Sequence, residues 1–373
     1  MTIVIALLLF GIIILIHEFG HFLLAKKNGV TVHEFSIGMG PKIYSREKNG
    51  TEYSLRILPI GGYVSMEGEE DGFDRSEEDD LDNEEDNDLM FDTKNDTEEK
   101  NENYSETEGE VNEGSFAEKT VLQRASIIFA GPFFNFLGCI GFLVVLFLII
   151  GVPTTKVGTL VDNAPAQAVG IKVGDEIKSV NGQEVTSSTD ITNIISASKG
   201  KEINLVVNRD GKDVEFDLSP KFSKDTQTYI IGITFDRTKN IIKSFTTSIT
   251  TTWDIAVQMV EFLGQLVTGR VAGGLSNSVA GPVGVIGMVS DAAKTGITNL
   301  LYLGAVISLN LGIMNLVPFP ALDGGRLLLL LIEALRGGKK LDPSKEAMIN
   351  IVGMSVLMAF MLFITYKDIL RLF

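Results

Sequence analysis

Two histidines and a glutamate near the N-terminus have the residue types and the spacing of a metal-dependent hydrolytic site. His17, Glu18 and His21 form an H-E-x-x-H motif inside an apolar segment that runs from Thr2 to Ala25. On a helix, residues four apart share a face, so both imidazoles can bind one zinc ion while Glu18 takes a proton from a water molecule that the metal activates. The motif therefore predicts a zinc-dependent peptidase.

The surroundings of this motif indicate a site inside a membrane. The segment from Thr2 to Ala25 is long enough to span a bilayer, and ionisable groups at that depth need a metal or a polar cavity. Only three histidines occur in the chain, and two of them belong to the motif. A cleavable signal peptide is the competing interpretation, but no basic region precedes the apolar run and no small-x-small site follows it. We therefore expect a transmembrane helix.

The composition indicates a membrane protein with one strongly acidic segment. Hydrophobic residues make up 45% of the 373 residues, and the formal net charge is -16. However, 23 acidic and 3 basic residues lie between Glu67 and Ser115, so the rest of the chain is net positive. With so few aliphatic side chains, residues 67–115 are expected to be a disordered cytoplasmic insert, or else to capture divalent cations or a partner. Cys139 is the single cysteine, so an intramolecular disulfide is excluded. This residue is expected to pack in the apolar run that contains it.

Residues 125–152 form a second apolar segment that is predicted to cross the membrane. It contains the sequence Gly131-Pro132-Phe133-Phe134-Asn135. Asn135 is interpreted either as an interhelical hydrogen-bonding residue or as a polar group turned toward a site. In the second case it is a candidate to bind substrate or to stabilise an oxyanion.

A third apolar segment, residues 300–317, leads into an irregular turn that contains Asn315, Pro318, Pro320 and Asp323. The two prolines cannot donate backbone hydrogen bonds, so a regular helix must end there. Irregular backbone at membrane depth needs a cover of protein or a water-filled cavity. Asp323 is therefore expected at such a place. Residues 349–365 are the fourth predicted membrane helix, and Glu333 between the two is expected at a helix end or in an ion pair.

The stretch from Gly38 to Met66 has the pattern of a β-hairpin. Two short β-like runs, residues 42–45 and 53–57, are joined through Asn49-Gly50, a sequence that is typical of a tight hairpin turn. Following directly on the motif helix, the hairpin is expected to place a strand edge near the metal, where an unwound substrate could pair with it. A plain surface hairpin is the alternative. His33, in the same region, is expected to be a polar residue at the membrane interface rather than a ligand.

Residues 154–237 have the alternating strands and turn signals of a soluble domain. The run from Ala164 to Ile177, followed by Val180-Asn181-Gly182, resembles the PDZ family in its short helix, its Gly-Asp-x-Ile strand and its Asn-Gly turn. The resemblance implies a domain that holds a peptide end against a strand edge. A domain that only spaces or blocks is the alternative. The next part, residues 238–296, is expected to contain an amphipathic helix, which lies on the bilayer or packs on the PDZ-like domain, and a glycine-rich linker.

Basic residues set the expected topology. If Lys26 and Lys27 are cytoplasmic, the acidic insert is cytoplasmic, residues 154–237 are extracytoplasmic, and the loop from Arg336 to Lys345 returns to the cytoplasm, in agreement with the positive-inside rule. This topology brings His21 and Asp323 to the same face of the membrane. The expected parts are residues 1–27 (first membrane helix), 28–66 (membrane-associated β-hairpin), 67–115 (acidic insert), 116–153 (second membrane helix), 154–237 (PDZ-like domain), 238–296 (amphipathic helix and linker), 297–335 (third membrane helix with the proline turn) and 336–373 (basic loop and fourth membrane helix).

Three motifs in this order make the chain resemble the site-2 proteases, the membrane-embedded zinc metalloproteases, and specifically the bacterial branch that carries a PDZ domain. They are His-Glu-Phe-Gly-His in the first helix, Gly-Pro-Phe-Phe-Asn-Phe in the second, and Asn-Leu-Val-Pro-Phe-Pro-Ala-Leu-Asp-Gly-Gly after the third. The resemblance implies that His17, His21 and Asp323 bind Zn²⁺ and that Glu18 is the general base. It further implies that Asn315, Pro318 and Pro320 shape a turn that faces the substrate, to which Asn310 is added as a weaker candidate.

The fold implied is a polytopic α-helical membrane protein with about four transmembrane helices, a membrane-associated β-hairpin and an inserted extracytoplasmic PDZ-like α+β domain. The function implied is cleavage in or near the transmembrane segment of single-pass membrane proteins, as the second cut after another protease. The substrates would be anti-sigma factors or signal-peptide remnants. A multi-pass location in the bacterial plasma membrane, with the active site toward the cytoplasm, is expected, with peptide ends as partners of the PDZ-like domain and no nucleic acid. The alternative is a catalytically silent, membrane-tethered PDZ adaptor.

Overall fold

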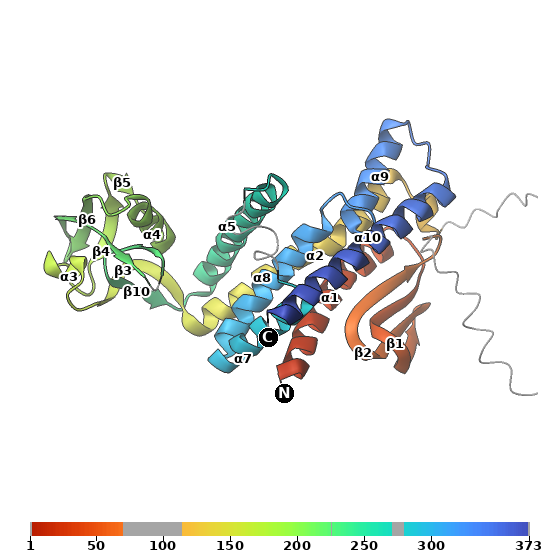
Figure 1. Cartoon of the computed structure of the whole chain (residues 1–373), viewed down its shortest axis with the longest axis horizontal. Helices are drawn as coiled ribbons and strands as arrows, with labels where there is room; N and C mark the ends of the chain where they lie inside the picture. Colours follow the sequence, from red (N-terminus) through yellow and green to blue (C-terminus); the bar gives the residue numbers. More distant parts are fainter. Residues whose placement is uncertain (1, 70–113, 225, 271–279, 372–373) are drawn as a thin grey trace, which may run out of the picture. The chain divides into compact units, whose positions relative to one another are not determined.

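The computed structural model describes residues 2–69, 114–224, 226–270 and 280–371 (Figure 1). Most of the acidic insert expected at residues 67–115 lies outside the described residues, and so does the stretch 271–279 of the expected linker. The chain forms two compact units. One contains residues 1–139, 256–295 and 306–373, and the other contains residues 140–255 and 296–305.

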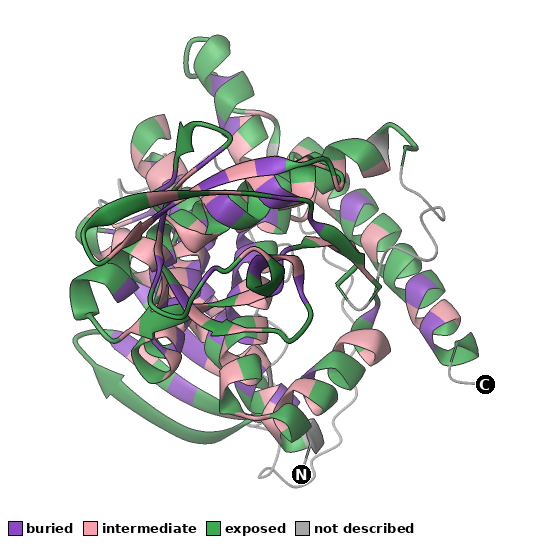
Figure 2. Cartoon of the chain, turned by 90° about the vertical axis from the view of Figure 1, so that its left-hand side faces the viewer, coloured by how far each residue is buried: buried purple, intermediate pink, exposed green. Residues whose placement is uncertain are grey.

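Four described helices are long and apolar enough to cross a membrane, which makes the chain a multi-pass membrane protein. They are α1 (Thr2–Lys27), α2 (Val121–Ile150), α8 (Ile297–Asn315) and α10 (Pro343–Leu370). Helix α10 is longer than the expected residues 349–365, because Asp342 caps its N-terminus and Pro343 occupies its first turn. Most of its large apolar side chains are exposed, and Figure 2 colours much of this helix, which ends at the C-terminus, as exposed. This exposure suits a helix that faces lipid.

Strands β1 (Val32–Lys48) and β2 (Thr51–Met66) form the hairpin, and both are longer than the short runs that the sequence indicates. Asn49 and Gly50 have φ of 54° and 71°, as a two-residue hairpin turn requires. The register pairs residues 34–37 both with residues 62–65 and with residues 52–55. The first part of β1 therefore lies in the interior of the sheet, and residues 62–66 form an edge.

A small apolar core fixes the hairpin to the membrane helices. It joins the end of α1 to both strands and to α2, and its buried residues are Ala25, Val30, Val32, Phe35, Val64, Met66 and Ile127. Glu34 on β1 is buried beside this core and accepts hydrogen bonds from Ser54, Tyr63 and Arg56. Burial alone would raise the pKa of Glu34, but these three donors hold it below its usual range. The charged group therefore ties the strands of the hairpin to one another.

Residues 152–238 fold into the sheet domain, whose main sheet has the strand order β10-β3-β4-β6-β7 with antiparallel neighbours. Its elements are β3 (Val152–Leu160), α3 (Pro165–Ala168), β4 (Glu176–Val180), β5 (Gln183–Glu184), α4 (Ser188–Ala197), β6 (Ile203–Arg209), β7 (Lys212–Leu218), β8 (Lys221–Ser223), β9 (Thr228–Ile230) and β10 (Ile233–Thr238). Asn181-Gly182 and Asp210-Gly211 form two-residue turns with positive φ, as the sequence indicates. Strands β9 and β10 are separated at Gly232, which takes a φ of 78° and lies against Ala164.

The sheet domain has an apolar interior, and its buried carboxylate Asp175 pairs with the partly exposed Arg209. Residues such as Ile177, Leu205 and Val207 are fully buried. Arg209 donates to Asp175 at 2.8 Å and 2.7 Å. Burial would raise the pKa of Asp175, but the hydrogen bonds and charge of Arg209 and the backbone N–H of Lys172 hold it below its usual range. The carboxylate therefore stays ionised and clamps β6 to the loop before β4.

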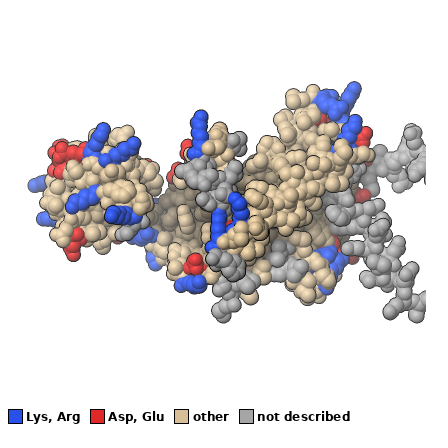
Figure 3. All heavy atoms as spheres, viewed as in Figure 1, with Lys and Arg blue, Asp and Glu red and all other residues tan. Residues whose placement is uncertain are grey.

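Four further helical segments complete the description: α5 (Ile241–Val267), α7 (Pro282–Thr295), α9 (Asp323–Leu335) and a short 3₁₀ segment (Phe116–Glu118). The amphipathic helix expected near residues 255–266 is the C-terminal part of the longer α5. The glycine-rich break at Gly281-Pro282-Val283-Gly284 is the start of α7, where the carboxylate of Asp368 in α10 accepts the N–H of Gly284 at 2.9 Å. Figure 3 shows charged side chains over the sheet domain and basic ones at the turn between α9 and α10, where Arg336, Lys339 and Lys340 lie.

Candidate metal centre

Helix α1 presents His17 and His21 on one face, one turn apart. Their Nε2 atoms lie 3.3 Å from each other, and the two rings are nearly perpendicular, with an interplanar angle of 81°. His17 is buried, whereas His21 and Glu18 are half-buried. The i, i+4 spacing therefore produces the convergence of two ring nitrogens that the sequence indicates.

Asp323 reaches the same point from the other end of the chain. Helix α8 ends at Asn315, and the proline-containing turn that follows leads directly into Asp323, the first residue of α9. Gly324 and Gly325 allow the start of α9 to lie against this turn, since added Cβ atoms would come within 2.5 Å of the carbonyl carbon of Leu316 and 2.7 Å of that of Phe319. As a result, Asp323 Oδ2 lies 3.2 Å from His17 Nε2 and 3.6 Å from His21 Nε2.

These three atoms fit a tetrahedral zinc ion. Ligand atoms at about 2.1 Å from zinc in a tetrahedron are separated by about 3.4 Å, and the observed separations are 3.3, 3.2 and 3.6 Å. Asp323 Oδ2 is buried and makes no hydrogen bond among the described residues, which is unusual for a buried carboxylate oxygen. Two imidazoles and one carboxylate are a donor set that zinc favours in catalytic sites, where a fourth position stays open. The residues present therefore fit the ion that the sequence indicates.

Two glycines allow α1 and α2 to approach closely at this site. A Cβ on Gly20 would lie 2.8 Å from the carbonyl carbon of Ala130. A Cβ on Gly131 would lie 2.5 Å from His21 Cε1 and 2.8 Å from His17 Cε1, and nearer still to His21 Nε2. Real Cβ atoms do not approach other atoms so closely, so any larger residue at position 131 displaces the imidazoles. The sequence motifs contain both glycines, but their role depends on which helices meet.

Two ion pairs hold α9, the helix that begins with Asp323. Arg124 of α2 donates to Glu333 at 2.5 Å, and both side chains are buried. The expectation that Glu333 serves in an ion pair is confirmed. Closer to the ligand, Arg326 pairs with Glu69, which follows the hairpin. Together these contacts fix the orientation of α9 against α2 and the hairpin, and hence the position of its first residue.

The weaker candidates from the sequence are placed unequally. Asn135 is fully buried, with its side-chain amide 2.9 Å from His17 Nδ1, and Asn315 lies with Nδ2 3.3 Å from His17 Nε2. Pro320 packs against Gly353 of α10. Asn310 and Pro318 are exposed, and within the described part of the chain no hydrogen bond joins Asn310 to the three ligands. The structure thus brings Asn135 and Asn315 to the site and leaves Asn310 and Pro318 exposed.

The hairpin edge lies beside the motif glutamate. A Cβ on Gly62 would come within 3.2 Å of Glu18 Cγ and 2.9 Å of the Ser36 carbonyl oxygen. Gly62 is the first residue of the edge formed by residues 62–66. The expectation of a strand edge near the metal centre is therefore met in the geometry. His33, in contrast, is exposed and pairs with Glu67, so it is separate from the ligand cluster.

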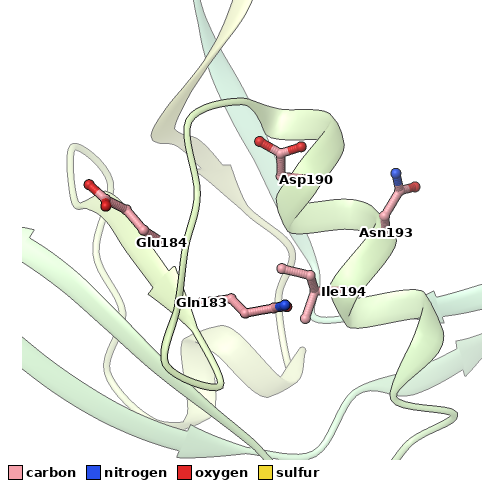
Figure 4. Close-up of a pocket in the computed structure, with 5 residues that line it drawn as sticks. All are labelled: Gln183, Glu184, Asp190, Asn193 and Ile194. Carbon is pink, nitrogen blue, oxygen red and sulfur yellow. The ribbon is translucent and has the colours of Figure 1, made fainter. Parts of the chain in front are cut away.

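A shallow hollow on the sheet domain is unrelated to this centre. It has a volume of about 370 Å³ and is lined by Gln183, Glu184, Asp190, Asn193 and Ile194 (Figure 4). Asp190 is already used in the capping box of α4, where its carboxylate accepts the N–H of Ser187. The carboxylate of Asp190 therefore serves to begin α4.

Comparisons with known proteins agree with this description. The model of the family described as Peptidase family M50 matches residues 5–360. The chain is similar to "Regulator of sigma-W protease RasP" of Bacillus subtilis (37% identical), to "Zinc metalloprotease RasP" of Bacillus licheniformis (36%) and to the protein of that name from Geobacillus kaustophilus (34%). These alignments cover 98% or more of this chain and 97% or more of each relative.

Among solved structures, the PDZ domain of an SdrC-like protein from Listeria innocua is 24% identical over 23% of this chain and 96% of its own length, with a TM-score of 0.21. The corresponding domain from Listeria monocytogenes is 26% identical over 23% of this chain and 86% of its own length, with a TM-score of 0.20. Scores this low add nothing to the description of the fold.

Proposed function

Because the chain belongs to peptidase family M50, the site-2 proteases, we propose that His17, His21 and Asp323 hold the catalytic zinc ion and that Glu18 is the general base. The chain is a zinc metalloprotease of the membrane. The observation that carries the assignment of the ligands is the convergence of two imidazole nitrogens and one carboxylate oxygen, all within 3.6 Å of one another, from residues about 300 positions apart. A silent PDZ adaptor would have no use for this cluster.

A zinc ion held by these three residues would polarise the scissile carbonyl and would lower the pKa of a water molecule enough for attack at neutral pH. Glu18, on the same helix as two of the ligands, accepts the proton of the attacking water and delivers it to the leaving amine. Asn315 offers a side-chain N–H on the ligand side of His17, 3.3 Å from its Nε2. We assign to it a hydrogen bond to the negative oxygen that forms during attack. Asn135, the earlier candidate for that role, is fully buried on the opposite side of His17.

The substrate is proposed to be a single-pass membrane protein that unwinds at the site. A transmembrane helix satisfies its own backbone hydrogen bonds, so cleavage requires local loss of helix, and the lost bonds must be replaced. The edge at residues 62–66 offers unpaired backbone groups beside Glu18, which supports binding of an extended substrate by strand addition. A relative is named a regulator of sigma-W protease. By analogy, we propose membrane-bound regulators of a sigma factor as the substrate class.

The sheet domain is proposed to be a PDZ-like domain on the extracytoplasmic side, with the metal centre toward the cytoplasm. Support comes from the basic residues at the C-terminal end of α1 and between α9 and α10, which the positive-inside rule places in the cytoplasm. In this arrangement the domain excludes substrates that still carry a large outer part, so cleavage follows a first cut by another protease. Deleting residues 157–235 should then allow cleavage of intact substrates. Unchanged resistance of those substrates would contradict the exclusion role.

The direct test of the reaction is Glu18→Gln, which keeps the size of the side chain and removes the base. In detergent, the wild type should cleave a model transmembrane substrate, whereas the variant should bind zinc normally and cleave at least 100-fold more slowly. Equal cleavage by the two proteins would exclude Glu18 as the base. The membrane proteins that accumulate as shortened forms in cells with Glu18→Gln would identify the natural substrates.

A further inference from the structure

We propose that Asn135 is a positioning residue of the zinc site, and that its side-chain oxygen accepts the Nδ1 proton of His17. The inference rests on the ligand set proposed above and adds a residue behind it. Asn135 lies on α2, is fully buried, and has its amide 2.9 Å from His17 Nδ1. It therefore contacts the ring from the side opposite the ligand atom, where no substrate can reach it.

Two observations determine which way the Asn135 amide points. As placed, its nitrogen faces His17 Nδ1, while its buried Oδ1 has no hydrogen-bond partner among the described residues. With the nitrogen there, Nδ1 must be the acceptor, and Nε2 must carry the ring proton and point it at the other two ligand atoms. Oxygen and nitrogen of an amide are exchanged by a half-turn of the group. After that half-turn, Asn135 Oδ1 accepts the Nδ1 proton of His17 and is no longer without a partner. His17 Nε2 then carries no proton and keeps its lone pair for the metal.

The second histidine is held in the same manner from the same helix. His21 Nδ1 lies 2.9 Å from the carbonyl oxygen of Ile127. A carbonyl can only accept, so His21 must carry a proton at Nδ1, and in the neutral ring this leaves Nε2 free to bind a metal. Ile127, Gly131 and Asn135 follow one another at intervals of four residues along α2, here called the α2 stripe. One member supplies an acceptor for His21, one supplies space, and one supplies an acceptor for His17.

The backbone at Asn135 is fixed independently of its amide. Ser308 of α8 donates to the Asn135 carbonyl oxygen at 2.9 Å, and a Cβ on Gly312 would come within 3.1 Å of Asn135 Cβ. The side chain therefore leaves a rigid, closely packed point of α2. Hydrogen bonds behind metal-bound histidines fix the tautomer and the orientation of the ring, and losing one costs about 10- to 100-fold in metal affinity.

The test compares zinc affinities of the full-length protein in detergent, measured by competition with a chromogenic chelator. Asn135→Leu removes the acceptor at similar volume and should weaken zinc binding about 10- to 100-fold. Asn135→Asp keeps an acceptor oxygen and should stay within about 3-fold of the wild type. Ser308→Ala is the matched control, because it removes a buried hydrogen bond at the Asn135 backbone without changing the amide, and it should weaken zinc binding less than Asn135→Leu does.

Wild-type affinity in Asn135→Leu would overturn the proposal, and so would Asn135→Asp or Ser308→Ala as weak as Asn135→Leu. A measurement on the unmutated side chain avoids any failure of a variant to fold. With only three histidines in the chain, ¹⁵N-histidine spectra of the zinc-loaded protein can be assigned with His33→Gln. The His17 signal should show a protonated Nδ1, and a bare Nδ1 would overturn the proposal. Zinc retained in His17→Ala would instead refute the ligand set itself.

Discussion

Replacing Gly131 with alanine tests the close approach of α2 to the two imidazoles. The added Cβ would lie 2.5 Å from His21 Cε1 and 2.8 Å from His17 Cε1, whereas carbon atoms in contact are separated by about 3.5 Å. The two imidazole rings must therefore move away from position 131 by about 1 Å, and this shift displaces the Nε2 atoms that bind the metal. A misplacement of this size costs about 100-fold in a catalytic site, or about 2.8 kcal/mol at about 1.4 kcal/mol per tenfold change.

The same substitution should not weaken the helix. Gly131 lies in a helical segment, where alanine is favoured over glycine by about 1 kcal/mol. Gly141→Ala on the same helix is the matched control, because its Cβ would meet nothing within 4 Å. The assay is the zinc dissociation constant in detergent, together with cleavage of a transmembrane substrate. If Gly131→Ala bound zinc within about 3-fold of Gly141→Ala, the close packing of α2 on the imidazoles would be wrong.

Three other outcomes are expected. Glu333→Leu leaves the buried guanidinium of Arg124 without its counter-charge and should lower the free energy of unfolding by about 3–5 kcal/mol. The double variant with Arg124→Met should recover most of this loss. An unchanged thermal midpoint for Glu333→Leu alone would contradict the pairing. The pKa of Asp175 is lower in the folded state than in the unfolded state, so its pair with Arg209 contributes fully to stability above the ordinary carboxyl pKa. This contribution is lost as the pH falls through the folded-state pKa. Pepsin should therefore cut residues 152–238 faster on acidification, and Asp175→Asn should flatten that pH dependence. Removal of metal with a chelator should abolish proteolysis and added zinc should restore it, while activity that survives a metal-free preparation would exclude a metalloprotease.

The sequence predicts those parts of the site whose structure is determined by residues close together in the chain. His17 and His21 are one turn apart on any helix, and Pro318 and Pro320 end α8 wherever it packs. Asn49-Gly50 forms its hairpin turn because φ is positive at both residues. These features depend on a few neighbouring residues, so they could be predicted before any tertiary contact was known.

The remaining features depend on contacts between distant residues, which periodicity does not determine. Arg124 and Glu333 are 209 positions apart, and neither residue alone indicates its partner. The role of Gly131 follows only from the helix opposite it. Likewise, the pairing of residues 34–37 on both sides depends on the register, and the division between β9 and β10 depends on one glycine at positive φ. The sequence therefore indicated which residues carry the chemistry, but not which residues hold them in place.

One zinc ion is proposed to join helix α1 to the start of α9. The most direct measurement is the zinc content of the purified full-length protein and of Asp323→Ala, with His33→Gln as the control for loss of a histidine outside the site. We expect one zinc per chain in the wild type and in His33→Gln, and a loss of at least tenfold in Asp323→Ala. Full zinc content in Asp323→Ala would contradict a metal site shared by these two distant segments.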